Sequence, residues 1–211
     1  PNDSLLKIIQ VGANKGIMGD PLHNFLKGYG KHVSILFIEP QISLKDELVK
    51  NTSSLCAETK YLFAAISSKE GTATMYVPNS SLFPNSSGGA SLHEEHLLSR
   101  YRKKMRDPSK GYSKLNVKTR TLTSAANEFN FSSLNNQQNT ICDVLVVDAE
   151  GHDDTVIYSI EDPKTLPPII SFEWKNLSSI KYNNFIKFLS ENGYEIIKWN
   201  KTDAMAFRFI K

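Results

Sequence analysis

Two stretches of this sequence decide its fold: IIQVGANKG at residues 8–16 and VLVVDAEGH at residues 144–152. Each is a run of β-branched and aliphatic side chains that stops in a glycine-containing turn. Such runs are typical of buried parallel strands, and open α/β sheets bind ligands beyond the carboxyl ends of these strands. The first turn is small and mostly apolar, whereas the second carries Asp148, Glu150 and His152. The two turns therefore predict one crevice, in which a cofactor would lie beside reactive groups.

The pattern around these turns predicts an alternating α/β chain. Apolar runs typical of strands lie at residues 7–11, 34–38, 61–66, 141–147 and 169–174, and the stretches that predict helices lie at 22–28, 43–50, 124–129, 153–160 and 182–191. Residues 194–199 and 204–210 flank a turn and predict a C-terminal antiparallel hairpin. This order is typical of a doubly wound, mostly parallel, Rossmann-like sheet, here of seven strands.

Helix-capping signals mark three of these boundaries. Asp20 precedes a proline, as expected for an N-cap followed by proline at the first helical position. Ser43 and Asp46 resemble a capping box. Gly193 follows the last predicted helix as a C′ residue.

The bulk composition indicates an ordinary globular domain. The chain has 211 residues, of which 40% are hydrophobic and 22% charged. Its formal net charge of +3 is too small to indicate a nucleic-acid partner, and we expect none. No apolar run approaches the ~20 residues of a membrane span. Nothing in the sequence sets an oligomeric state.

Residues 78–116 interrupt the α/β repeat between two short strands predicted at 72–77 and 117–122. The segment starts with Pro, Asn, Ser and Gly residues, and residues 92–106 then predict a helix. Its basic side chains are Arg100, Arg102, Lys103, Lys104 and Arg106. Excursions this long are typically lids, binding loops or disordered segments. We therefore expect one domain over residues 1–211 with 78–116 as an inserted lid.

Polar residues of this insert have two interpretations. His93 and His96 share a helical face and lie close to Ser91. They are either site residues or exposed polar residues. The basic side chains are either a solvated face or a surface that draws an anionic acceptor or surface toward the crevice.

The first turn limits the choice of cofactor. A dinucleotide fingerprint needs a glycine where this chain has Asn14, and a P-loop needs a Gly-Lys-Ser/Thr run that is absent. Glu39 ends the next strand, where an acid can accept both ribose hydroxyls. A small glycine turn, a ribose-binding acid and no phosphate cradle favour S-adenosylmethionine over a purely structural turn.

The whole set of motifs resembles the FkbM family of methyltransferases, within the Rossmann-like S-adenosylmethionine-dependent superfamily. The residues that carry the resemblance are 10–16, 37–40, 64–67, 69–71, 117–122, 147–152 and 172–173. They follow the family's order over nearly the whole chain apart from the insert, and the Asp-x-Glu-Gly-His turn is the most specific of them.

This resemblance implies roles for the cofactor-binding residues. The methionine part of the cofactor would lie against Gln10, Gly12, Ala13, Asn14 and Gly16. Glu39 would bind the ribose, with Pro40 and Gln41 beside the rest of the adenosine. The adenine would lie near Ala64 and Ala65, and the methyl group near Asp148. The family usually has an acid at the position of Gln10, and an amide binds an ammonium group less strongly than a carboxylate does.

The second turn and the next strand supply candidate catalytic groups. Methyl transfer to oxygen needs an aligned acceptor and a base that takes the hydroxyl proton. Asp148, Glu150 and His152 provide both kinds of group, and Glu173 ends the strand at 169–174 on the same rim. The alternatives are a turn cap, a helix N-terminus favoured by acids, and a surface histidine. Asp148 and Glu150 could also hold a divalent cation, so a metal is left open.

The sequence therefore predicts an S-adenosylmethionine-dependent O-methyltransferase that acts on a hydroxyl of a sugar, glycan or small metabolite. Residues 78–116 would select this acceptor. Two alternatives stay open: a dinucleotide-dependent oxidoreductase on the same fold, and a non-catalytic S-adenosylmethionine-binding module.

Cysteine usage and glycosylation motifs point to different compartments. Cys56 and Cys142 are far apart and favour free thiols, which indicates the cytoplasm. Asn-x-Ser/Thr triplets at Asn51, Asn79, Asn85, Asn130, Asn176 and Asn200 keep the secretory-pathway lumen open as the alternative, with an anchor preceding Pro1.

Overall fold

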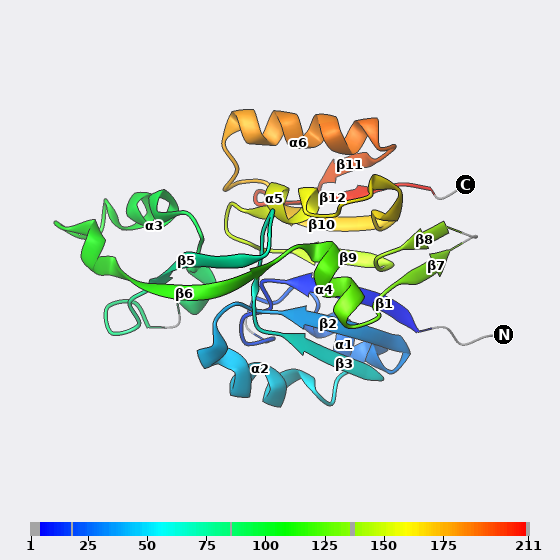
Figure 1. Cartoon of the computed structure of the whole chain (residues 1–211). Helices are drawn as coiled ribbons and strands as arrows, with labels where there is room; N and C mark the ends of the chain where they lie inside the picture. Colours follow the sequence, from blue (N-terminus) through cyan, green and yellow to red (C-terminus); the bar gives the residue numbers. More distant parts are fainter. Residues whose placement is uncertain (1–4, 18, 85, 136–137, 210–211) are drawn as a thin grey trace.

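The fold is built on one central sheet, seen in a computed structural model that describes residues 5–17, 19–84, 86–135 and 138–209 (Figure 1). The sheet has seven strands in the order β11-β12-β10-β9-β1-β2-β3. These are β1 (Leu6–Val11), β2 (Val33–Ile38), β3 (Glu58–Leu62), β9 (Val144–Val147), β10 (Ile169–Glu173), β11 (Glu195–Lys198) and β12 (Asp203–Phe207). All pairs are parallel except those of β12, which confirms the predicted fold; Ile210, in the predicted hairpin, lies outside the described residues.

Two layers of helices cover the central strands, because successive side chains of a strand point to opposite faces. Ile8, Ile35 and Phe37 pack with α1 (His23–Tyr29) and α2 (Lys45–Thr52). Ile9 and Leu36 face the other way, toward α4 (Leu122–Glu128), α5 (Asp153–Tyr158) and α6 (Ser179–Glu191). This double cover explains why all of β2 is buried.

The strand order reverses at β1, which pairs with β2 on one side and β9 on the other. The turns that follow β1 and β9 therefore meet. The Asp148 N–H donates to the Val11 carbonyl over 3.0 Å. Gly12 has φ +84°, and a Cβ placed on it would lie 1.9 Å from the Asp148 carbonyl oxygen. Glycine at this position lets the two turns touch.

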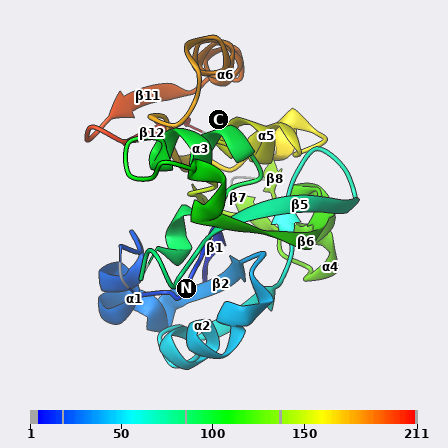
Figure 2. The same ribbon diagram turned by 90° about the vertical axis from the view of Figure 1, so that its left-hand side faces the viewer.

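A second, three-stranded sheet carries the insert, and most of its residues lie outside 78–116. The predicted strand at 61–66 is wrong as a single element: β3 ends at Leu62, and β4 (Ala65–Ile66) joins a sheet of order β4-β6-β5. In it, β5 (Gly71–Pro78) pairs antiparallel with β6 (Tyr112–Arg120), which begins inside the predicted insert. Figures 1 and 2 show this ribbon and α3 (Glu94–Tyr101) beyond one end of the central sheet.

Several boundaries differ from the sequence prediction. The Asp20 carboxylate accepts from the Leu22 N–H over 2.7 Å, but α1 starts only after Leu22, so Asp20 lies in the loop. Ser43 caps nothing, because residues 42–44 form a 3-10 turn before α2. The helix predicted at 92–106 is shortened to α3, and β7 (Ser133–Asn135) and β8 (Gln138–Thr140) form a hairpin in place of a predicted loop, of which residues 136–137 lie outside the described part. Gly193 has φ +81° after α6, as predicted.

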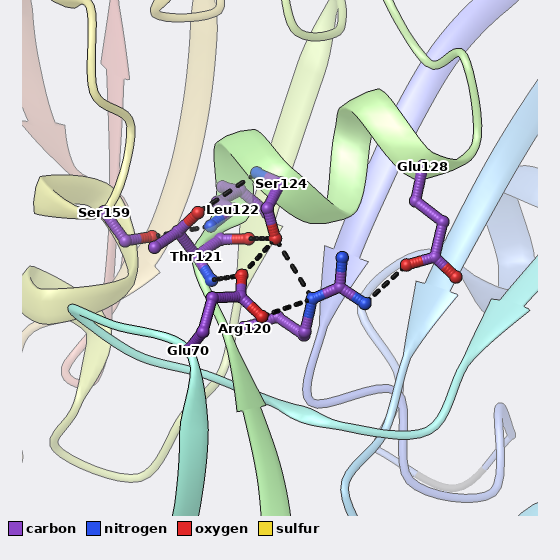
Figure 3. A network of polar contacts seen from close by, with 7 residues as sticks. All are labelled: Glu70, Arg120, Thr121, Leu122, Ser124, Glu128 and Ser159. Carbon is purple, nitrogen blue, oxygen red and sulfur yellow. Dashed lines mark hydrogen bonds and ion pairs between the residues drawn. The ribbon is translucent and has the colours of Figure 1, made fainter.

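A polar network joins the base of the ribbon to the helices (Figure 3). The Arg120 Nε lies 2.7 Å from Glu70, and Glu70 also accepts from the hydroxyl of Ser124 in α4. The Leu122 N–H donates to the Ser159 hydroxyl over 2.9 Å, which ties the start of α4 to the end of α5. These contacts hold the ends of β5 and β6 that lie next to the central sheet against α4 and α5. In the described part of the chain, no helix is long and apolar enough to cross a membrane.

Substituting Gly12→Ala should destabilise the protein by about 2–4 kcal/mol. The new Cβ would clash with the Asp148 carbonyl, and alanine would also be strained at the left-handed φ of this position. The matched control is Gly193→Ala, which has a similar φ of +81° and nothing within 4 Å of the added Cβ. We expect only about 1–2 kcal/mol there. Urea unfolding measures both. Equal losses would contradict the close contact between the two turns.

Candidate functional site

A pocket of about 280 Å³ opens at the carboxyl ends of β1, β2 and β9, where the reversal of strand order predicts one. The predicted cofactor residues that line it are Gln10, Gly12, Ala13, Asn14, Glu39, Pro40, Gln41, Ala64, Ala65 and Asp148. Gly16 does not line the pocket, because it is buried next to Leu48 and Thr52 of α2. Glu150 and His152 line the pocket too, whereas Glu173 lies outside it.

Glu39 holds the first turn against the end of β2. Its carboxylate accepts from the backbone N–H groups of Asn14 and Gln41, each over 2.8 Å. Burial raises the pKa of Glu39, and these hydrogen bonds oppose the shift. Each carboxylate oxygen has more than one acceptor position, so Glu39 can still bind a hydroxyl pair.

Asp20 and Gln10 form a second acceptor group in the pocket. The Gln10 Nε2 donates to Asp20 Oδ2 over 3.1 Å, and the buried Gln10 Oε1 has no partner among the described residues. Burial raises the pKa of Asp20. A carboxylate and an unpaired amide oxygen that face one pocket can bind a group with several N–H donors, such as an ammonium. The sequence singled out Asp20 only as a helix cap.

Asp148 lies on the pocket wall where the two turns meet. Asp148 is exposed to solvent in the open pocket, but the protein atoms around its carboxyl desolvate it and raise its pKa to about 7. The negative charges of Glu150, Glu173, Asp203 and Asp20 add to the shift in that order. A group with such a pKa can act as a general base near neutral pH.

Glu150 connects the second turn to the insert. Its φ of +48° is uncommon for a residue with a side chain. Its carbonyl accepts from the Ser91 hydroxyl over 2.9 Å, and its Oε2 accepts from Asn176 Nδ2 over 3.0 Å. The same oxygen lies 3.1 Å from Nε2 of His96, although the two are not aligned as a hydrogen bond.

Glu173 supports Glu150 through a shared partner. Asn176 Nδ2 donates to Glu173 Oε2 over 2.5 Å as well as to Glu150. Burial, followed by the charge of Glu150, raises the pKa of Glu173 to about 7. Asn176 is one of the predicted glycosylation sites, but its amide is committed to these two acids. Asn85, another such site, lies outside the described residues.

His152 is buried at the start of α5 and bridges two parts of the chain. Its Nδ1 lies 3.1 Å from Nε2 of His93 in the insert, and its Nε2 lies 3.3 Å from the Ser67 hydroxyl. Burial, followed by the charge of His93, lowers the pKa of His152 to about 4. His152 is therefore neutral at pH 7, and both of its ring nitrogens already have partners.

The insert contacts both turns. On the cofactor side, the Ser87 hydroxyl donates to Asn14 Oδ1 over 3.0 Å. On the other side, His93, His96 and Arg100 lie near the second turn, a spacing of three and four residues that puts them on one helical face. That spacing could have singled out Arg100, whereas no local signal points to Asp20 or Asn176.

No group of three or more His, Cys, Asp or Glu side chains in the described residues is arranged to hold a metal ion. The two cysteines, Cys56 and Cys142, are free thiols.

Solved methyltransferases are similar to this chain in overall fold. The precorrin-6y C5,15-methyltransferase from Geobacter metallireducens is 9% identical, with 97% of this chain and 80% of that chain covered and a TM-score of 0.43. The Aeropyrum pernix fibrillarin with natively bound S-adenosyl-L-methionine is 11% identical, with 99% and 69% covered and a TM-score of 0.45. The CurJ carbon methyltransferase is 10% identical, with 98% and 49% covered and a TM-score of 0.46.

The family comparison covers most of the sequence. No curated protein matches the chain significantly. The model of the methyltransferase FkbM domain matches residues 10–196, which include both turns, the insert and the ends of β2 and β10. The chain therefore belongs to the FkbM methyltransferase family and is, at that level, an S-adenosylmethionine-dependent methyltransferase.

Proposed function

We propose that this protein transfers the methyl group of S-adenosylmethionine to a hydroxyl of a sugar, glycan or small metabolite. The observation that carries the proposal is the position of Asp148, a carboxyl with a pKa of about 7 beside the cofactor turn. Transfer to oxygen requires removal of a proton, and Asp148 is suited to accept it.

The residues of the pocket fit the cofactor. Glu39 would hold the ribose, Ala64 and Ala65 would lie near the adenine, and the turn at 12–14 would line the methionine part. Asp20 and Gln10 would bind its ammonium group, because Gln10 Oε1 lacks a partner and Asp20 carries a charge. The pocket wall is acidic on this side, which complements the two positive charges of the cofactor.

The bound cofactor supplies an electrophilic methyl carbon. The acceptor oxygen would take this methyl group as the cofactor's carbon–sulfur bond breaks to leave a neutral thioether, and the Asp148 carboxylate would take the hydroxyl proton. Glu150 would position the insert, and Glu173 would hold Glu150 through Asn176. His152 would join the insert to the second turn rather than act as the base, because its nitrogens are already engaged.

The insert at residues 78–116 would select the acceptor within one domain that spans residues 1–211. Its contacts with Asn14 and Glu150 put it over both turns, so an acceptor would enter between the insert and the core. We do not assign a metal to Asp148 and Glu150, because these acids are explained as base and positioning residue.

We also propose a cytoplasmic location. The two free thiols support it, and so does Asn176, because a glycan on its amide would break its bonds to Glu150 and Glu173.

Glu39→Ala should weaken binding of S-adenosylmethionine at least about 100-fold, since it removes two charge-assisted hydroxyl contacts and releases the first turn. Isothermal titration calorimetry measures this loss. The matched control is Glu47→Ala, an exposed acid of α2 that pairs with Lys15 and should bind like the parent. Unchanged binding by the Glu39 variant would refute the ribose assignment.

Asp148→Asn should lower kcat by about 10²–10⁴-fold and leave the affinity for S-adenosylhomocysteine within about twofold. In the parent, Asp148 is protonated below its raised pKa and ionised above it. Affinity for the cationic cofactor should therefore rise as pH increases through about 7, more steeply than affinity for the neutral thioether product. Calorimetry from pH 6 to 8 tests this, and parallel pH profiles in parent and variant would contradict the role.

Asp20→Asn should weaken S-adenosylmethionine and S-adenosylhomocysteine equally, by about 10- to 100-fold, because both carry the amino-acid ammonium. Methylthioadenosine lacks that group, so its affinity should not change. A loss for all three compounds would indicate a damaged pocket instead of a missing ammonium contact.

A further inference from the structure

We propose that the acceptor carries an anionic group, a carboxylate or a phosphate, which Arg100 binds. This inference rests on the proposed function, because it concerns the acceptor of the same reaction. Arg100 lies in the last turn of α3 and lines the pocket from the insert, near the second turn.

Arg100 is a basic residue in a pocket whose other charged lining residues are acids. The acids that line it are Asp20, Glu39, Asp148 and Glu150, and among the described lining residues Arg100 alone is a lysine or arginine. The acids gather near the cofactor turns, where positive charge is expected. A single guanidinium on the insert marks the side of the pocket where negative charge would be bound.

The guanidinium lies against the backbone of the insert. A Cβ on Gly89 would lie 1.9 Å from Nη1 of Arg100, so the absence of a side chain at position 89 leaves the space that the guanidinium occupies. Gly89 is itself buried in the 3-10 turn at residues 87–89. Gly89 therefore leaves room for the guanidinium beside the pocket.

Within the described part of the protein, the ion pair that Arg100 forms with Glu150 is at the outer limit of such contacts. The Oε1 of Glu150 lies 4.0 Å from Nη1 of Arg100, beyond hydrogen-bond distance. The other Glu150 oxygen is engaged by Asn176. The exposed fraction of the Arg100 side chain is 40%, so a planar oxyanion can reach two of its N–H groups.

The surface next to Arg100 has the same sign. Arg102, Lys103, Lys104 and Arg106 follow it, and all four are exposed. They would raise the local concentration of an anionic acceptor. The carboxylate of the cofactor itself could bind Arg100 instead of an acceptor anion. The two cases can be told apart, because loss of Arg100 would weaken cofactor binding only in the first.

The test begins with the affinity of the full chain for S-adenosylhomocysteine, which examines the proposed function alone. Glucuronate, glucose 6-phosphate and glucose are then titrated into the protein saturated with that product. We expect at least one anion to bind about tenfold or more tightly than glucose. The arm that binds better, carboxylate or phosphate, gives the class of the acceptor.

Arg100→Gln should abolish this preference and leave the affinity for S-adenosylhomocysteine unchanged, whereas Arg100→Lys should keep part of it. The matched control is Arg102→Gln, the same change at an exposed neighbour, which should keep the preference. The inference is overturned if the parent binds neither anion more tightly than glucose, or if both glutamine variants lose the preference equally. It is also overturned if Arg100→Gln weakens the binding of S-adenosylhomocysteine instead. In each case the cofactor assignment stands on its own titration.

Discussion

The contact between the turns that follow β1 and β9 is the constraint on which the site depends. A glycine at position 12 allows the Asp148 carbonyl to lie where a side chain would start, and the Asp148 N–H bonds to the end of β1. Because β1 and β9 pair in parallel, with Val11 opposite Val147, their turns begin at the same edge of the sheet. The acidic corner is therefore adjacent to the cofactor turn as a consequence of backbone packing alone.

This packing has an electrostatic cost that the ligand can offset. Desolvation raises the pKa values of Asp148 and Glu173 to about 7, and the negative charge of Glu150 adds to both shifts. A carboxyl with a raised pKa holds its proton more tightly in the folded protein, so ionising it as pH increases reduces the free energy of unfolding. A cationic ligand reverses that effect. The raised pKa of Asp148, which lines the pocket, is thus better explained by ligand binding than by stability.

The sequence was sufficient for the sheet and the strand ends, because periodic apolar runs and glycine turns are local signals. It placed Glu39, Asp148 and Glu150 at the pocket for that reason. It misjudged residues 61–66, since an apolar run does not indicate which of two sheets each half joins. Asp20 and Asn176 were missed as site residues because their partners lie in other elements, so that only the folded chain brings them together.

The two sides of the pocket are built in different ways, and this bears on specificity. The cofactor side consists of strand ends fixed by the ladder and by buried hydrogen bonds to Glu39. The insert side is joined to it by side-chain contacts of Ser87, Ser91 and His93, which cost less to break than a buried core. Glu70 and Arg120 join the base of the β5–β6 pair to α4 and do not reach the insert. If the proposed roles hold, a site built on strand ends with an insert attached by side-chain contacts would change its acceptor while keeping its methyl donor.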